Sequence, residues 1–214
     1  MICLVEIKQW VKDIVIYFEF LNNINLKLFK LCSLDCWNDI TSIEKYYLDI
    51  SQDLFRLLPC SANTKLKKIN LIESDGIFSI NDGIEELKGE IKKFVLENND
   101  ILYTIKYIRN KTEHMPHKLK AEGFYSGSTG SDIRFSYENE SLNINFNDLK
   151  KLVIKLNEIF IKMQNDLSKY QNQLSEEYKT YPCWDYLKSM NFEIYNKLLL
   201  SENLYDISFV INKY

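Results

Sequence analysis

The sequence predicts a mainly α-helical fold: a bundle of four long helices with an inserted β-hairpin and an extra C-terminal helix. Apolar residues recur at alternating spacings of three and four along most of the 214 residues, and this is the period of one face of an α-helix. Only six glycines and three prolines occur, so few positions interrupt a helix. We expect the bundle to occupy residues 1–180 with the hairpin at about 124–146, and a helical extension at 181–214 to pack on it.

The first predicted helix runs from about Leu4 to about Cys32 and carries two apolar rows. Asn25 interrupts the first row. So wide an apolar face indicates a helix buried on two sides, either within the bundle or at a contact between subunits. The first row consists of Leu4, Ile7, Val11, Ile14, Phe18, Leu21 and Leu28, and the second of Trp10, Tyr17, Ile24 and Leu31.

The second and third predicted helices are bounded by prolines. A helix over 36–58 is closed by Pro59, whose ring cannot continue a helix interior. The third helix begins near Asn81 or Asp82, either of which can cap it. It ends or kinks just before Pro116, because proline disfavours helical geometry at the residue that precedes it.

The hairpin is predicted from two alternating runs between the third and fourth helices. Gly127–Ser131 has the composition of a loop. Apolar and polar residues then alternate over 133–137 and again over 142–146, which is the pattern of two paired strands. Asn147 is expected to cap the fourth long helix, and a shorter helix is expected at 184–200.

Composition and charge exclude several classes of protein. No stretch approaches the roughly 20 uncharged apolar residues of a membrane span. Charged residues interrupt the apolar N-terminal segment, unlike the core of a secretory signal. We therefore expect a cytoplasmic protein with no membrane partner. The interrupting residues are Glu6, Lys8, Lys12 and Asp13.

The cysteines indicate neither disulfides nor a metal site. Five occur, an odd number, in a chain without an export signal, so reduced thiols are expected. Cys32 and Cys36 lie four apart, but no second Cys or His pair completes a zinc set. We expect no metal and no other cofactor.

One basic segment stands out in a chain of net charge −3. The stretch "IKYIRNKTEHMPHK" contains both histidines of the protein, His114 and His117. Between residues 106 and 120 five basic residues face one acid, a local net charge of +4. Such a cluster around two imidazoles is typical of a phosphate-binding surface.

Within this segment, "RNKTEH" (Arg109–His114) resembles the signature of the HEPN superfamily, the "higher eukaryotes and prokaryotes nucleotide-binding" proteins. That signature is an arginine, usually followed by a polar residue, with a histidine after a short spacer. The resemblance extends to the bundle of four long helices. It implies a metal-independent endoribonuclease, of the toxin or abortive-infection (phage-defence) type, in which the RNA 2′-hydroxyl attacks the neighbouring phosphate.

The residue types suit this chemistry. The pKa of histidine lies near neutrality, so His114 is the candidate acid–base residue. Arg109 is the candidate phosphate clamp, because a guanidinium keeps its charge and its planar fork. Asn110 is expected to orient His114 or to donate to phosphate. The candidate RNA-binding residues around them are Lys106, Lys111, His117, Lys118 and Lys120. In the hairpin, the candidate stacking surfaces for bases are Tyr125, Phe135 and Tyr137, although packing explains them as well.

The spacing of the motif adds a geometric constraint. Five residues separate two side chains on an ideal helix by about 140°, so Arg109 and His114 cannot meet on one straight face. Either the helix breaks between Lys111 and Glu113, or a second copy completes the site. The resemblance implies the second arrangement, a homodimer with a composite cleft.

Other interpretations of the same residues stay open. Arg109 and Glu113 can form an ion pair on the helix surface, and His114 can satisfy a helix C-terminus. The chain would then be a non-catalytic helical module that binds nucleotides or a partner protein. A further possibility is a regulatory subunit that neutralises another enzyme. An antitoxin or another defence-system protein is a possible partner of a toxin.

Overall fold

The computed structural model describes residues 4–32, 40–57, 93–114, 119–127, 130–137, 140–173 and 176–201. The first part of the bundle consists of α1 (Leu4–Leu31), α2 (Ile40–Leu57) and α5 (Asn99–His114). Three strands follow, β1 (Leu119–Gly127), β2 (Gly130–Tyr137) and β3 (Glu140–Asn145), and lead into α6 (Phe146–Gln173). Three short helices come last, α7 (Glu176–Lys179), α8 (Cys183–Lys188) and α9 (Glu193–Leu200). The mainly α class with inserted β structure is confirmed.

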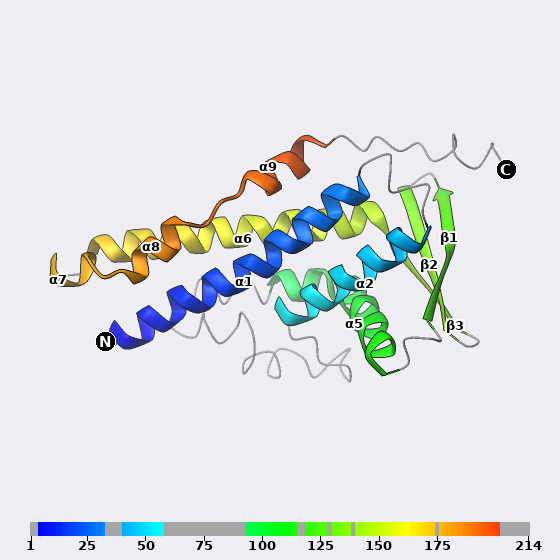
Figure 1. The fold of residues 1–214 in the computed structure, drawn as a ribbon, viewed down its shortest axis with the longest axis horizontal. Helices are drawn as coiled ribbons and strands as arrows, with labels where there is room; N and C mark the ends of the chain where they lie inside the picture. The colour runs from blue at the N-terminus through cyan, green and yellow to red at the C-terminus, as the bar shows by residue number, and fades with distance from the viewer. Residues whose placement is uncertain are drawn as a thin grey trace.

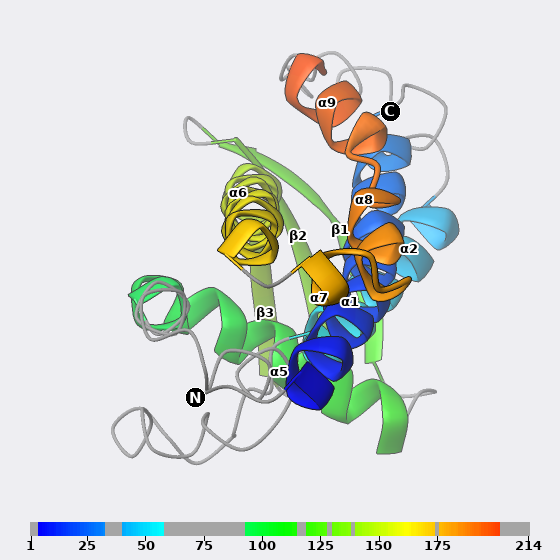
Figure 2. The same ribbon diagram turned by 90° about the vertical axis from the view of Figure 1, so that its left-hand side faces the viewer.

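The elements are arranged around α1. Helix α1 contacts α2, α6, α8 and α9, and Figure 1 shows α8 and α9 lying along the α1–α6 pair while the sheet stands at one end of the bundle. In Figure 2 the bundle is seen from the end opposite the sheet, and α6 lies to one side of α1, α8 and α9. No helix within the described ranges has both the length and the apolarity that crossing a membrane requires.

The bundle itself covers both apolar rows of α1 over the part whose side chains the structure describes, from Val11 to Leu31. The described members of the rows are at most 3% exposed, apart from Tyr17, which is partly buried against the same core. The width of the apolar face is therefore explained by burial inside one chain, and it does not require a contact between subunits. These buried residues are Val11, Ile14, Phe18, Leu21, Ile24, Leu28 and Leu31.

Asn25, the polar residue in the α1 row, is fully buried and pairs with a fully buried asparagine of α6. The amide of Asn25 donates to Oδ1 of Asn157 at 2.8 Å, and the amide of Asn157 donates back to Oδ1 of Asn25 at 2.8 Å. Asn157 also donates to the carbonyl of Val153 at 2.7 Å. Buried amides are costly unless they are hydrogen-bonded, so this pair favours one register of α1 against α6.

An ion pair joins α1 to α2, the helix that supports α5. Nζ of Lys27 lies 2.7 Å from Oδ2 of Asp53, whose side chain is almost fully buried. Helix α2 in turn contacts α5. The orientation of α5 is thus set indirectly by α1. The predicted start of this third helix near Asn81 lies outside the described residues, but residues 93–97 are helical and lead into α5.

The inserted sheet is larger than the predicted hairpin. Strands β2 and β3 form the expected antiparallel pair, and β1 adds a third strand along the other edge of β2. The predicted loop at Gly127–Ser131 contains the ends of these two strands, since Gly127 pairs with Gly130. A register shift between Ala121 and Gly123 interrupts β1. The two glycines and the bulge of β1 interrupt the alternation of apolar and polar residues that predicts a strand. The strand is stabilised by its backbone hydrogen bonds to β2, which the local sequence does not indicate.

The start of α6 corrects a second expectation. The helix begins at Phe146, and Oδ1 of Asn145 accepts a hydrogen bond from the backbone N–H of Asp148 at 3.2 Å. This is the geometry of an N-cap residue. Asn145 therefore caps the helix, and Asn147, the predicted cap, lies inside its first turn.

The C-terminal segment forms two short helices where one was predicted. Oδ1 of Asn191 accepts a hydrogen bond from the N–H of Glu193 at 2.8 Å, so a new helix starts there. The segment is fastened at its end, where Nζ of Lys150 donates to the carbonyl of Ser201 at 2.7 Å. Burial raises the pKa of the nearby Cys32 thiol, opposed by a hydrogen bond with Ser201 and by the charge of Lys150.

The buried amide pair generates a prediction about stability. Asn25→Leu should lower the free energy of unfolding by about 1–3 kcal/mol, because it leaves the amide of Asn157 buried without its partner. The double variant Asn25→Leu/Asn157→Leu should regain most of that loss. Urea denaturation followed by circular dichroism measures both. Asn23→Leu, on the exposed side of α1, is the matched control and should change stability by less than about 0.5 kcal/mol. A double variant that is less stable than the single one would contradict this view of the pair.

Candidate functional site

The "RNKTEH" motif occupies the last turns of α5. The buried side of this helix is apolar and faces α2, and its innermost residues are Leu102, Ile105 and Ile108. The helix continues without interruption to His114. A break between Lys111 and Glu113, one of the two ways to unite Arg109 and His114, is therefore excluded.

A hydrogen bond brings Arg109 toward the face that carries His114. Nη1 of Arg109 donates to Oδ1 of Asn110 at 3.0 Å. Asn110 and His114 are four residues apart, so they lie on the same face of the helix, about 40° from each other. The backbone positions of Arg109 and His114 are about 140° apart around the helix. The hydrogen bond to Asn110 turns the guanidinium of Arg109 part of the way toward the face of His114. In the structure Asn110 accepts this hydrogen bond from Arg109, and its predicted contacts with His114 or with phosphate stay predictions.

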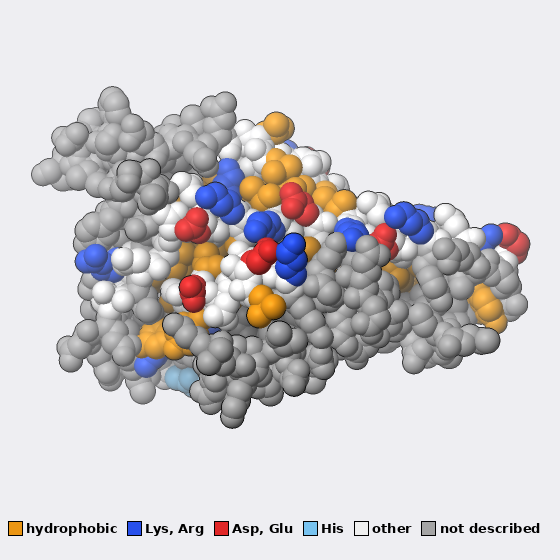
Figure 3. Space-filling view, turned by 180° about the vertical axis from the view of Figure 1, so that it is seen from behind, with side chains coloured by type: hydrophobic (Ala, Val, Ile, Leu, Met, Phe, Trp, Pro, Cys, Tyr) orange, Lys and Arg blue, Asp and Glu red, His pale blue; other side chains and the backbone are white. Residues whose placement is uncertain are grey.

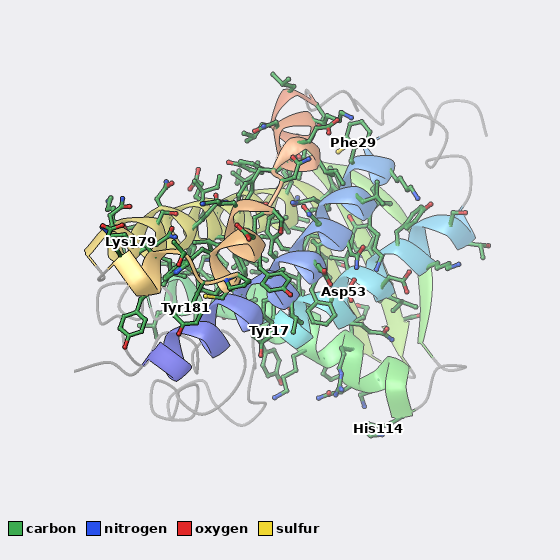
Figure 4. The ribbon with its side chains drawn as sticks, turned by 60° about the vertical axis from the view of Figure 1, so that its left-hand side comes forward. Tyr17, Phe29, Asp53, His114, Lys179 and Tyr181 are labelled. Carbon is green, nitrogen blue, oxygen red and sulfur yellow. The ribbon has the colours of Figure 1, made fainter. Side chains whose placement is uncertain are left out.

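His114 lies at the C-terminal end of the helix. It is exposed, and Figure 4 shows its side chain at the tip of α5, directed away from the other helices. An exposed imidazole at a helix end is open to a substrate as large as a nucleic acid strand. The same exposure leaves the site open to a second copy of the chain.

The predicted RNA-binding residues differ in exposure and in whether the structure describes their side chains. Lys106 is only 8% exposed, so its burial argues against the predicted direct contact with RNA. Lys111 is partly exposed, with Nζ 5.0 Å from the centre of the Tyr107 ring, a cation–π contact. Lys120 is on β1, where its backbone pairs with Ser136. His117 and Lys118 lie outside the described residues, as does the side chain of Lys120.

A groove lies at the opposite end of α5 from the motif. It has a volume of about 770 Å³ and runs between residues 96–101 and α6. Its lining carries four acidic and two basic side chains, and Figure 3 shows acidic and basic side chains interleaved on this side of the molecule. Both lysines are paired with acids, Lys155 with Glu97 at 3.7 Å and Lys151 with Asp148 at 3.6 Å, so the walls are acidic overall. Such walls have no net attraction for a polyanion. Among the described residues, no group of three or more His, Cys, Asp or Glu side chains is arranged to hold a metal ion.

Two tyrosines near the motif were missed by the sequence analysis. Tyr103 is 45% exposed and Tyr107 is partly exposed. Tyr103, Tyr107 and Lys111 follow one another at spacings of four, which places them on one face of the helix, and this spacing was visible in the sequence. Among the predicted stacking residues of the hairpin, Phe135 is not available to a base, because it is fully buried with its ring centre 6.0 Å from that of Tyr47. The side chains of Tyr125 and Tyr137 are outside the described part.

Comparisons with protein-family models, with curated proteins and with solved structures found no match to this chain.

Proposed function

We propose that the chain is a metal-independent endoribonuclease of the HEPN type, a toxin or phage-defence effector that cleaves RNA by attack of the 2′-hydroxyl. The observation that carries the proposal is the arrangement at the end of α5. Arg109 is held against Asn110 at 3.0 Å, and His114 is exposed one turn further along the same face. Phosphoryl transesterification requires a cation and an accessible acid–base group, and the end of α5 carries one of each.

The reaction needs two proton transfers. A base removes the proton of the 2′-hydroxyl as its oxygen attacks phosphorus, and an acid protonates the leaving 5′-oxygen. The products are a 2′,3′-cyclic phosphate and a free 5′-hydroxyl. Arg109 stabilises the charge that develops on the phosphate oxygens, and His114 serves as base or acid.

A homodimer through the ends of α5 supplies the second proton carrier. The described part of one chain contains one histidine, His114, at this site. A two-fold axis beside it would bring together two imidazoles and two guanidiniums, so that one histidine acts as base and the other as acid. The described members of the apolar rows of α1, from Val11 to Leu31, are covered within the chain, so this dimer does not depend on them.

A non-catalytic helical module is the second candidate function. The observation that favours it is that Arg109 already has a partner on its own helix and its backbone position faces away from His114. In that case the basic end of α5 would bind a nucleotide, an RNA or a partner protein, with an antitoxin or another defence protein among the possible partners. Such a module would leave RNA uncut.

The proposed roles predict the losses of activity. His114→Ala should lower kcat about 10²–10⁴-fold, and Arg109→Ala about 10²–10³-fold. The losses should not add fully in the double variant, because both groups act on one transition state. His117→Ala and Arg134→Ala, an arginine on the sheet bonded to Asn143, are the controls and should cost much less.

The measurement is cleavage of a labelled oligoribonucleotide in EDTA, with the product ends identified by mass. A substrate with deoxyribose on the 5′ side of the scissile phosphate should bind and resist cleavage. Cleavage of this deoxy substrate, or His117→Ala as the inactive variant, would refute the assigned roles.

The position of Asn110 predicts that it acts through Arg109. Asn110→Ala should reduce kcat by roughly tenfold, within the loss expected for a misplaced positioning group. In the Arg109→Ala background the same change should have almost no further effect, because the group it positions is absent. A merely structural role would lower stability in both backgrounds, which thermal unfolding detects. Fully additive losses would show that Asn110 contacts the RNA itself.

The composite site predicts complementation between inactive variants. Arg109→Ala and His114→Ala chains, co-expressed with different tags and purified as a mixed dimer, should be more active than either parent dimer, since the mixed site holds one guanidinium and one imidazole where each parent lacks one of the two groups altogether. The mixed dimer should stay below the wild type, because it has lost one of the two proton carriers. Light scattering should give the mass of a dimer for the wild type. A mixed dimer as inactive as its parents would mean that each copy uses only its own motif.

A further inference from the structure

One side of α5 carries a row of aromatic and basic side chains that ends at the proposed catalytic histidine. The row consists of Tyr103, Tyr107, Lys111 and His114, at spacings of four, four and three. At about 100° per residue, these positions lie within about 80° of one another. The row extends about 16 Å along the helix.

This row is on the side of α5 that the core does not use. Leu102, Ile105 and Ile108 are buried, and they project from the other side of the helix. Tyr103 is 45% exposed, one of the large hydrophobic side chains that the fold leaves at its surface. Lys111 extends over the ring of Tyr107, with Nζ 5.0 Å from the ring centre. The row therefore offers the exposed ring of Tyr103 and, beside it, a cation that lies over the ring of Tyr107.

We propose that this row is a base-stacking track that holds single-stranded RNA along α5 on one side of the scissile phosphate. Tyr103 stacks on one base. Lys111 moves from the Tyr107 ring to the phosphate between the track and the site, so that Tyr107 stacks on a second base, and His114 lies at the track's end. This proposal rests on the proposed function, because the position of the track relative to the cut assumes that cleavage takes place at His114. Stacking on aromatic side chains is how proteins hold single strands without sequence preference, and the cation complements the charge of the backbone.

The charges on α5 limit the length of the track. Asp100 is exposed and lies on the same side of the helix, about one turn before Tyr103. Glu97 precedes it in the wall of the acidic groove. Carboxylates repel phosphates, so the strand leaves the helix beyond Tyr103. The track therefore holds about two bases, as many as it has aromatic rings.

A duplex does not fit this surface. Its bases are stacked on one another, and their faces are hidden from a protein side chain, whereas unpaired bases can stack on aromatic rings. The track therefore makes binding depend on unpaired nucleotides beside the cut. It does not depend on the 2′-hydroxyl, so single-stranded DNA should occupy it too.

The test is a binding measurement in the His114→Ala background, where the RNA stays intact. Fluorescence anisotropy is recorded with a labelled 12-nucleotide single-stranded oligo(A) RNA, its DNA counterpart and a duplex of equal length. Tyr103→Ala should weaken binding of both single strands about tenfold, as expected for the loss of one stacked base. Tyr103→Phe keeps the ring and should stay within about twofold. Tyr186→Ala removes a tyrosine that is 50% exposed on α8 and should have no effect.

A second measurement reports stacking directly. Tyr103→Trp places an indole in the row, and its fluorescence should be quenched when either single strand binds, beyond the change seen with the unsubstituted chain. In the active protein, Tyr103→Ala should raise KM and leave kcat nearly unchanged.

The outcomes separate the track from the proposed function. If Tyr103→Ala binds as well as the wild type, if Tyr186→Ala loses as much, or if the duplex binds equally well, the track is wrong even where RNA is cleaved. If the chain binds no nucleic acid and captures a protein instead, the track is also wrong. If single strands bind in a Tyr103-dependent manner while the wild type cuts no RNA, the track stands and the ribonuclease does not.

Discussion

Burial of α1 is the constraint on which the rest of the structure depends. A helix with two apolar rows must be covered along most of its circumference, and here α2, α6, α8 and α9 share that task. Asn25 restricts how they do so, because a buried amide needs a partner and Asn157 of α6 satisfies it in both directions at 2.8 Å. Sliding α6 by one turn would separate the two amides and leave Asn157 with only its hydrogen bond to the carbonyl of Val153. The pair therefore contributes more to the uniqueness of the packing than an additional apolar contact would.

The position of the candidate site follows from this packing through two contacts. Lys27 of α1 holds Asp53 of α2 at 2.7 Å, and α2 covers the apolar side of α5. Because that side is occupied, the opposite side of α5 and its C-terminal end are left at the surface. Arg109, Asn110 and His114 are thus presented by a rigid helix, which is a more exact support for a catalytic group than a loop.

The periodic parts of the fold could be predicted from the sequence, and the paired and capped parts could not. The rows of α1 and α6 follow from local spacing, because one helix face determines which residues are buried. Strand β1 has two glycines and a bulge, so its conformation depends on pairing with β2, which no local pattern encodes. Asn145 caps α6, and the predicted Asn147 does not. Asparagine is a good cap at either position, and only the path of β3 distinguishes the two.

The same division applies to the candidate site. The motif and its place at the end of a long helix could be predicted, because proline fixes the boundary and the residue types limit the chemistry. The burial of Lys106 and the exposure of Tyr103 could not be predicted, since they depend on which side of α5 faces α2. The bond from Arg109 to Asn110 was also missed, because neighbours in sequence point about 100° apart on a helix and only a long, flexible side chain closes that angle.

The electrostatics of α5 indicate how a polyanion would approach an acidic protein. The net charge of −3 opposes association with RNA at a distance, so attraction must come from a local excess of positive charge. That excess is at the C-terminal end of the helix, around Arg109 and Lys111. At the other end, Glu97 and Asp100 line a groove whose lysines are paired with acids. The gradient along one helix therefore favours a strand that enters at His114 and extends only part of the way along α5. An apolar or a uniformly basic helix would bind RNA without fixing where along the strand the histidine lies. Here the transition from basic to acidic within about four turns would give a bound strand a defined end, which in the proposed function would bring one phosphate to the histidine.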